Sequence, residues 1–233
     1  MTGVGDGLKV GAVLLAAGAG SRMGHRPKAL LELDGVALIR GVLTALAGAG
    51  IDDVVVVLGH HADTIDAALR GFCVTRVRNP APDDGQPSSL RIGLRALPTD
   101  LSAVMIALAD QPLIEAQDIR VLINAFEARG AMAMVVPRVR HPHGTTTPGN
   151  PVIISHDLRD EWLAGDVNAA GRRWREQHPH RVGWFETDNP RYILDVDTPD
   201  DLERFTQRTG HVLRWPAGLA WPQTHHPPGE AHP

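Results

Sequence analysis

One stretch near the start of the chain constrains the fold most: a short apolar run at residues 10–15 passes abruptly into small residues and glycine. The run has the length and branching of a strand that is buried on both faces. Gly18 and Gly20 let the backbone turn sharply and bring its N–H groups against a ligand, because no Cβ stands in the way. Arg22 and Lys28 add two cations within reach of a bound anion. This order predicts a polyphosphate site immediately after a buried strand.

Three known kinds of glycine-containing loop fit this stretch less well. A Walker loop ends in Gly-Lys-Ser/Thr, whereas this chain continues Gly24-His25-Arg26-Pro27-Lys28. A dinucleotide fingerprint requires G-x-G-x-x-G, and the glycine after Gly20 comes one residue too late. A glycine-rich turn that binds nothing would not need Arg22 and Lys28 at these spacings.

The composition limits the classes of partner and compartment. With 233 residues, 43% of them apolar, the chain is long enough for one sizeable α/β domain with its own core. A formal net charge of −4 offers no overall electrostatic footprint for nucleic acid. No apolar run approaches the ~18 residues of a membrane span, and the run near the start lacks the features of a signal peptide. We therefore expect a cytoplasmic enzyme with neither nucleic acid nor membrane as a partner.

The single cysteine, Cys73, excludes an internal disulfide and any metal site built on several cysteines. It lies between Phe72 and Val74 in an apolar stretch. We therefore expect a buried structural thiol.

Strands and helices alternate along the chain, which favours an open, mainly parallel sheet covered by helices. Apolar runs predict strands, and apolar residues at three- and four-residue steps predict helices. The predicted strands are 10–15, 54–58, 73–77, 103–108, 131–136, 151–155, 182–185 and 192–194, and the predicted helices are 36–47, 63–69, 88–97, 119–128 and 199–206. Residues 137–150 break this rhythm and predict a hairpin arm. We predict one domain over residues 1–208 and a poorly ordered tail, rich in proline and histidine, over residues 209–233.

Polar residues follow several of the predicted strands. In an open parallel sheet, ligands collect outside the carboxyl ends of the strands. Gly59 follows the strand at 54–58, and Asp110 follows the strand at 103–108. A carboxylate in that position suits a Mg²⁺ ion that holds phosphate oxygens, although aspartate at such a point also serves as a helix cap.

A second acidic run lies near the end of the predicted domain. Asp195 and Asp197 alternate, so both side chains would point to the same face of an extended strand. Asp200 and Asp201 are explained as the acidic first turn of a helix that Thr198 caps. Asp195 or Asp197 is therefore the predicted second metal ligand, and the sequence does not separate the two.

Several motifs together resemble one family. Leu15-Ala16-Ala17-Gly18-x-Gly20-x-Arg22-Met23-Gly24, with the following Lys28, resembles the signature of nucleotidyltransferases of the MobA-like group. Ser88-Ser89-Leu90-Arg91-x-Gly93 resembles a segment of the molybdenum cofactor cytidylyltransferase (MocA-type) branch, and Asp195-x-Asp197-Thr198-Pro199-x-Asp201-Leu202 resembles the family's closing motif. The resemblance covers residues 9–206. It implies a three-layer αβα, Rossmann-like, mainly parallel sheet of the nucleotide-diphospho-sugar transferase type, with residues 1–208 as the NTP transferase domain.

The resemblance implies a Mg²⁺-dependent transfer of CMP from CTP to a phosphorylated molybdopterin-type cofactor, with release of pyrophosphate and with a molybdoenzyme as partner. The expected catalytic residues are Arg22, Lys28 and Asp110. The expected Mg²⁺ ligands are Asp110, Asp195 and Asp197. The residues expected to surround the nucleotide lie in the loops after the strands and at one helix start, where Ser88 also fits a simple cap: Leu15, Ala16, Ala17, Gly18, Gly20, Ser21, Gly59, Ser88 and Ser89.

Two elements depart from the family's pattern. Asn150 stands where the family's Gly-His-Pro element has histidine, and Gly165-Asp166 reaches Gly171-Arg172 with altered spacing. Both lie in the half that contacts the acceptor, so the identity of the acceptor stays open. The alternatives are a guanylyl- or sugar-phosphate nucleotidyltransferase, an NAD(P)H-dependent oxidoreductase of the nicotine blue type on the same fold, and a non-catalytic cofactor chaperone.

Overall fold

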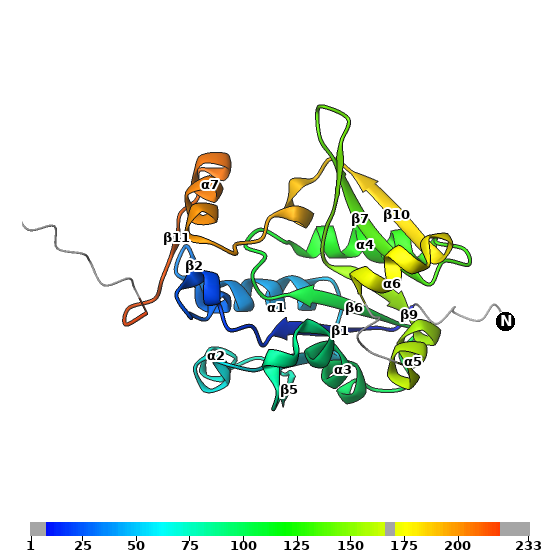
Figure 1. Cartoon of the computed structure of the whole chain (residues 1–233), viewed down its shortest axis with the longest axis horizontal. Helices are drawn as coiled ribbons and strands as arrows, with labels where there is room; N and C mark the ends of the chain where they lie inside the picture. Colours follow the sequence, from blue (N-terminus) through cyan, green and yellow to red (C-terminus); the bar gives the residue numbers. More distant parts are fainter. Residues whose placement is uncertain (1–7, 166–170, 220–233) are drawn as a thin grey trace, which may run out of the picture.

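A computed structural model describes residues 8–165 and 171–219. The strands of its main sheet are β1 (Val10–Ala16), β4 (Val54–Leu58), β5 (Thr75–Arg78), β6 (Ala103–Leu108), β7 (Met134–Arg140), β8 (Thr146–Pro148), β9 (Val152–Ser155) and β10 (Val182–Thr187). They run in the order β10-β7-β9-β6-β1-β4-β5, with β8 beside β7 (Figure 1). β1 is parallel to both β4 and β6, whereas β9 runs antiparallel between β6 and β7.

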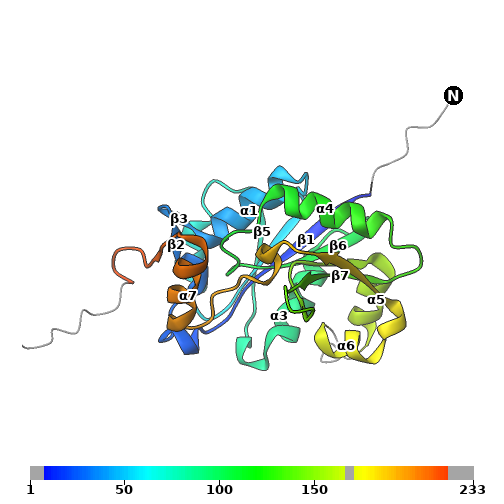
Figure 2. The same cartoon turned by 90° about the horizontal axis from the view of Figure 1, so that it is seen from above.

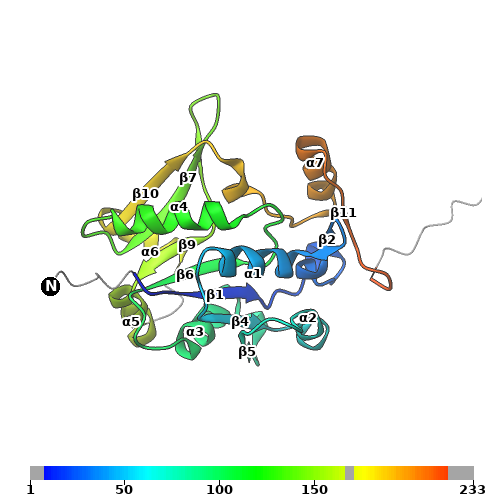
Figure 3. The same ribbon diagram turned by 180° about the vertical axis from the view of Figure 1, so that it is seen from behind.

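Helices cover both faces of this sheet. The helices that the structure describes are α1 (Leu38–Gly48), α2 (Ala62–Ala68), α3 (Gln86–Ala96), α4 (Ala116–Glu127), α5 (His156–Ala164), α6 (Arg172–Gln177) and α7 (Pro199–Thr209). α1 and α4 lie side by side on one face, and α3, α5 and α6 lie on the other (Figures 2 and 3). The predicted three-layer, mainly parallel arrangement is confirmed. Within the described ranges, no helix has the length and apolar character needed to cross a membrane.

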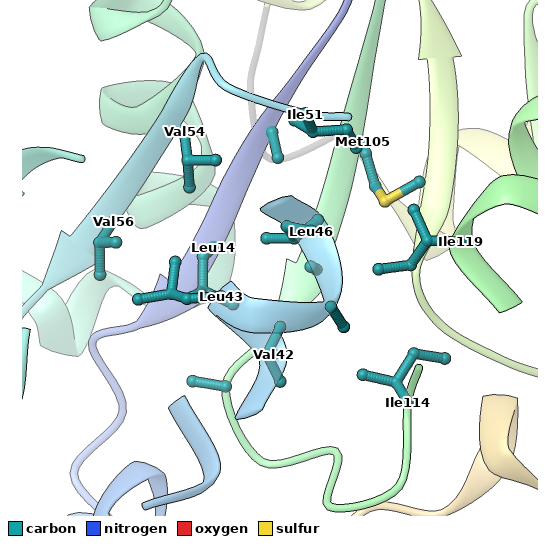
Figure 4. Close-up of a cluster of buried hydrophobic side chains, with 14 of the residues drawn as sticks. Leu14, Val42, Leu43, Leu46, Ile51, Val54, Val56, Met105, Ile114 and Ile119 are labelled. Carbon is teal, nitrogen blue, oxygen red and sulfur yellow. The ribbon is translucent and has the colours of Figure 1, made fainter. Parts of the chain in front are cut away.

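The alternation of side chains along β1 explains why this strand is buried on both faces. Leu14 packs in the core beneath α1, against Leu43 (Figure 4). Its neighbour Val13 points the other way, into the core beneath α3. Gly93 brings α3 close to the sheet, because a Cβ there would lie 2.4 Å from Cγ1 of Val13. The central strand is thereby held rigidly from both sides.

A smaller apolar cluster, here called the apolar clasp, joins the loop after β1 to the C-terminal part of the chain. Its buried members are Met23, Leu31, Leu38, Val196, Phe205 and Leu213. Met23 follows Arg22 directly, and Val196 lies between Asp195 and Asp197. The clasp therefore brings two segments that are distant in sequence to the same place.

The clasp includes the beginning of the segment for which the sequence predicted a poorly ordered tail. β11 (Leu213–Arg214) pairs antiparallel with β2 (Glu32–Leu33), which in turn pairs with β3 (Val36–Ala37). This pairing follows from the burial of Leu213 in the clasp. Residues 220–233 of the predicted tail lie outside the described residues.

Some local predictions are confirmed and others are wrong. The hairpin arm at residues 137–150 is present, formed by β7 and β8 (Figure 1). Cys73 is exposed, not buried, because it precedes β5 at an edge of the sheet. Residues 192–194 do not form a strand: Pro190–Ile193 is a 3-10 helix, η6, started by the side chain of Asn189. No strand contains Asp195 or Asp197.

The start of α7 carries a pH-dependent contribution to stability. The Oγ1 of Thr198 accepts a hydrogen bond from the N–H of Asp201, whose Oδ2 accepts one from the N–H of Thr198 at 2.8 Å. Burial alone would raise the pKa of Asp201, but hydrogen bonds from Thr198, Arg204 and the N–H of Asp197 outweigh it and lower the pKa from 3.8 to about 2. The charged form therefore stabilises the fold above pH 3.8, and this contribution is lost as the pH falls through about 2.

We expect Asp201→Asn to lower the free energy of unfolding by up to about 2 kcal/mol at neutral pH. This difference from the natural protein should shrink as the pH falls toward the pKa of Asp201 in the folded protein. Chemical denaturation across this pH range measures the loss of unfolding free energy and its dependence on pH. Asp200→Asn makes the same charge change in the same turn and should cost less than about 0.5 kcal/mol. Equal losses in the two variants would contradict the prediction.

Candidate functional site

The loop after β1 presents backbone N–H groups that have no partner in the protein. Within the part of the chain that the structure describes, the N–H groups of Gly18, Ala19 and Gly20 donate no hydrogen bond. Gly20 has a φ of +62°, and a Cβ on it would lie 2.0 Å from the carbonyl oxygen of Arg26. A Cβ on Gly59, after β4, would lie 2.4 Å from the carbonyl oxygen of Ala17. These two glycines shape the loop, and its free N–H groups form a surface suited to an anion.

Four of the predicted site residues meet beside this loop. Lys28, at the start of the 3-10 helix η2 (Lys28–Leu30), donates a hydrogen bond to Oδ2 of Asp110 at 2.6 Å and another to Oδ1 of Asp197. The side chains of Lys28 and Asp110 are each 18% exposed, so the pair is largely screened from water. Arg22, from the 3-10 helix η1 (Ser21–Met23), donates to Oδ2 of Asp197 at 2.9 Å. Asp197 thus forms ion pairs with both Lys28 and Arg22.

The amine of Lys28 stays protonated. Burial alone would lower the pKa of Lys28, but the charges and hydrogen bonds of Asp110 and Asp197 outweigh burial and raise it. The side chain therefore offers a fixed positive charge at the carboxyl ends of β1 and β6, where an anionic ligand would gain most from it.

Asp195 differs from Asp197 in its surroundings. The pocket walls partly desolvate Asp195, and the negative charges of Asp110 and Asp197 lie close to it; together these effects raise the pKa of Asp195. No ion pair or side-chain hydrogen bond to Asp195 occurs in residues 8–165 and 171–219. Asp195 thus lacks the close cation contacts of Asp197.

The residues present fit a divalent cation. Oδ1 of Asp110 is buried without a hydrogen-bond partner, although Oδ2 of the same carboxylate is paired with Lys28. Among the described residues, no three carboxylate, histidine or cysteine side chains form a group that could hold a metal by themselves. Mg²⁺ commonly takes only one or two carboxylates and completes its shell with water and substrate phosphates. Asp110 and Asp195 together match that requirement.

The two predicted serines are held by a residue that sequence reasoning missed. Asn79 is 3% exposed, and its Nδ2 donates to Oγ of Ser88 and to Oγ of Ser89, each at 3.0 Å. The N–H of Ala81 donates to Oδ1 of Asn79 at 2.9 Å, which fixes the amide. Asn79 follows β5, and its position after a strand was the available signal.

A cavity of about 420 Å³ collects most of the predicted residues. Its lining includes Leu15, Ala16, Ala17, Gly18, Arg22, Lys28, Ser89, Asp110, Asp195 and Asp197. Gly20, Ser21, Gly59 and Ser88 are not part of this lining. Gly85, Gln86 and Ile65 also line it and were not among the predicted site residues. Lys28 and Asp110 both line this cavity, so they lie on the same face of the molecule.

A second cavity, of about 430 Å³, adjoins the first, with which it shares Leu15, Gln86 and Leu108. Described residues of both elements that depart from the resembled pattern line this cavity. Asn150 lines it, and the N–H of Asn150 donates to the carbonyl of Tyr192 at 2.8 Å. Gly171 and Arg172 also line it, whereas Asp166 lies outside the described residues.

Gln111 links chain segments that contribute to the two cavities. It is 3% exposed and follows Asp110 directly. Its Nε2 donates to the carbonyl of Asn150 at 2.9 Å and to the carbonyl of Tyr192 at 3.3 Å. Tyr192 stands three residues before Asp195. One buried amide therefore fixes the segments that carry Asp110, Asp195 and Asn150 relative to each other.

Comparison with known proteins adds three findings. The family model described as the MobA-like NTP transferase domain matches residues 12–182. Nicotine blue oxidoreductase from Paenarthrobacter nicotinovorans is 31% identical over 200 residues, which are 82% of this chain and 94% of that protein. Bifunctional protein GlmU from Sorangium cellulosum is 34% identical over 142 residues. That match covers 57% of this chain but only 30% of GlmU, so the chain spans about a third of that relative.

Among solved structures, Rv0371c from Mycobacterium tuberculosis superposes with a TM-score of 0.67 at 28% identity, over 86% of this chain and 98% of that one. A second structure of Rv0371c is a complex with manganese and superposes with a TM-score of 0.63. The two likenesses cover 86% and 85% of this chain.

Proposed function

The chain belongs to the MobA-like NTP transferase family, and on that premise we propose that it transfers a nucleoside monophosphate from a nucleoside triphosphate to a phosphorylated small molecule. One observation carries the proposal: Lys28 bridges Asp110 and Asp197 on the wall of the cavity that the free N–H groups of the glycine loop adjoin. Charge-assisted contacts of this kind are what a triphosphate requires.

In the proposed reaction, an oxygen of the acceptor phosphate forms a bond to the α-phosphorus of the nucleotide. The bond from that phosphorus to the oxygen bridging to the β-phosphorus breaks, and pyrophosphate leaves with the electron pair. An acceptor phosphate is already ionised at neutral pH, so no proton has to be removed by a strong base. Positioning and charge stabilisation supply most of the rate.

The roles of the residues follow from their places. The N–H groups of Gly18, Ala19 and Gly20 surround the triphosphate, and Arg22 and Lys28 neutralise the β- and γ-phosphates and the charge that develops on pyrophosphate. Asp110 and Asp195 would hold Mg²⁺, which when bound neutralises and orients phosphate oxygens. The manganese complex of Rv0371c supports a divalent cation in this family.

The base and the acceptor rest on the sequence resemblance. The segment Ser88-Ser89-Leu90-Arg91 favours CTP as nucleotide, with Ser89 on the cavity wall near the place of the base. We propose a molybdopterin-type phosphate as acceptor and a molybdoenzyme as the downstream partner. We further propose that residues 1–208 form the NTP transferase domain, that Gly59 and Ser88 support the nucleotide loops from behind, and that the enzyme acts in the cytoplasm.

A panel of nucleoside triphosphates tests the proposal. With Mg²⁺ present, we expect CTP to raise the melting temperature more than GTP, ATP or UTP, and pyrophosphate to be released when phosphorylated molybdopterin is added. A larger shift with GTP, or release of pyrophosphate with a sugar phosphate, would favour the guanylyl- or sugar-phosphate alternative. Binding of a nucleotide with no release of pyrophosphate would favour a cofactor chaperone.

A second candidate is supported by one observation: the relative named nicotine blue oxidoreductase matches over most of both chains. An oxidoreductase on this fold would bind NAD(P)H in the first cavity. The cluster of Lys28, Arg22 and the neighbouring carboxylates favours a metal-bound triphosphate instead. Oxidation of NAD(P)H in the presence of a quinone-like substrate, followed by its absorbance, distinguishes the two.

A further inference from the structure

The second cavity combines an apolar body with a cationic wall. Leu90, Ile106, Met134 and Val152 contribute apolar surface from α3, β6, β7 and β9. Arg172, Arg173 and Arg175 line it from α6. None of the described residues in this lining is acidic. A cavity of this kind suits a ligand with an apolar or aromatic body and a negative charge.

The three arginines are not equivalent. Arg172 is paired with Glu176 at 2.8 Å, so its charge is compensated within α6. Neither Arg173 nor Arg175 has an ion pair with a residue that the structure describes. Arg173 is exposed, whereas Arg175 is half-buried. An unpaired, partly desolvated guanidinium gains more from a bound anion than an exposed one does.

Arg175 is also fixed in place. Its Cζ lies 5.6 Å from the ring centroid of Trp184 on β10, and the Cζ of Arg138 lies 4.5 Å from the same centroid. Burial, followed by the nearby charge of Arg172, lowers the pKa of Arg175. The charge of Glu176 opposes these effects only in part, so a bound anion would relieve them further by adding negative charge beside the guanidinium. The guanidinium is therefore preorganised beside the cavity.

The first cavity already provides cations for the phosphates of the nucleotide. Lys28 and Arg22 lie there, and the shared residues Gln86 and Leu108 mark the junction between the two cavities. A molecule whose phosphate reaches that junction would extend its body along the apolar surface toward α6. A second negative group on that body would meet Arg175.

We propose that the acceptor of this transferase carries, besides the phosphate that attacks, a second anionic group on an apolar or aromatic body, and that Arg175 binds that group. The proposal rests on the proposed nucleotidyl transfer and specifies its acceptor class. It makes Arg175 a specificity-determining residue, while Arg22 and Lys28 serve the β- and γ-phosphates of the nucleotide.

Matched ring phosphates test the second anion directly. Phenyl phosphate carries one anionic group, and 3- and 4-carboxyphenyl phosphate add a carboxylate to the same ring. Titration calorimetry with the full chain and Mg²⁺ should give the better carboxylated isomer a 10- to 100-fold lower Kd, about the size of a charge-assisted hydrogen bond. Arg175→Gln should reduce this preference to about threefold or less, and Arg175→Lys should retain part of it.

Arg95→Gln is the matched control, because Arg95 is an exposed arginine of α3 that lines neither cavity. The preference of Arg95→Gln for the carboxylated phosphate should equal that of the natural protein. The proposal is overturned if phenyl phosphate and the carboxyphenyl phosphates bind with equal affinity, or if none of them binds. It is also overturned if Arg175→Gln keeps the preference for the carboxylated phosphate. The CTP-induced shift in melting temperature, measured on the same samples, reports on the nucleotide site alone. Its absence would refute the proposed function while the ring phosphates still decide the role of Arg175.

Discussion

Lys28→Ala should lower the rate of pyrophosphate release by about 10²–10³, comparable to the loss of one preorganised charge-stabilising donor. Lys28 is the one side chain that contacts both Asp110 and Asp197 in the described structure. Removal of the Lys28 side chain leaves these two carboxylates without the amine that pairs with both. It also removes the fixed positive charge that would stabilise the departing pyrophosphate. Rapid-quench measurement of pyrophosphate at saturating nucleotide and Mg²⁺ gives the effect on kcat.

A matched control separates this role from a general change in charge. Lys9 forms an ion pair with Asp100 at 2.7 Å on the surface, next to the start of β1 and away from the cavities. Lys9→Ala removes the same charge and should leave the rate within about twofold. Undiminished pyrophosphate release by Lys28→Ala would contradict the transferase assignment. A melting temperature close to that of the natural protein shows that the variant is folded.

Asp195→Asn and Asp197→Asn should change different kinetic parameters. Asp195 forms no ion pair within the described ranges, so its loss should raise the half-saturating Mg²⁺ concentration at least about tenfold and lower kcat by about 10² or more. Asp197 holds Lys28 and Arg22, so its loss should leave the Mg²⁺ requirement unchanged and raise the KM for the nucleotide. Asp110→Asn should combine a large loss in kcat with a raised Mg²⁺ requirement.

Titration of Mg²⁺ at several nucleotide concentrations measures this difference. The two variants make the same charge change two residues apart, so each serves as the control of the other. Identical dependence on Mg²⁺ in both would show that the structure does not separate the two aspartates. A greater Mg²⁺ requirement in Asp197→Asn would reverse their roles.

The glycine loop and the sheet could be predicted because local sequence determines them. β1, β4 and β6 appear as uninterrupted apolar runs, and Gly18 and Gly20 follow the first of these directly. Thr198 and Asp201 form the cap expected from their spacing. These features depend on residues close to one another, where strand burial and capping rules apply.

The remaining features depend on contacts between distant segments. Asp195 and Asp197 could be distinguished only once Lys28 and Arg22, more than 160 residues earlier, were placed beside Asp197. The helix α6 has one buried apolar side chain, Trp174, so its sequence carries no helical periodicity. The amide of Gln111 gave no signal, because its acceptors are backbone carbonyls.

The apolar clasp also sets the order in which a ribosome can complete the site. A growing chain that has emerged as far as α5 carries Lys28, and it carries the glycine loop and Asp110, which follow the paired strands β1 and β6. It still lacks Asp195, Asp197 and the clasp residues Val196, Phe205 and Leu213. Met23 then has no apolar partners from the C-terminal side, and Lys28 has one carboxylate instead of two. The proposed nucleotide site is therefore completed only when this C-terminal segment has emerged.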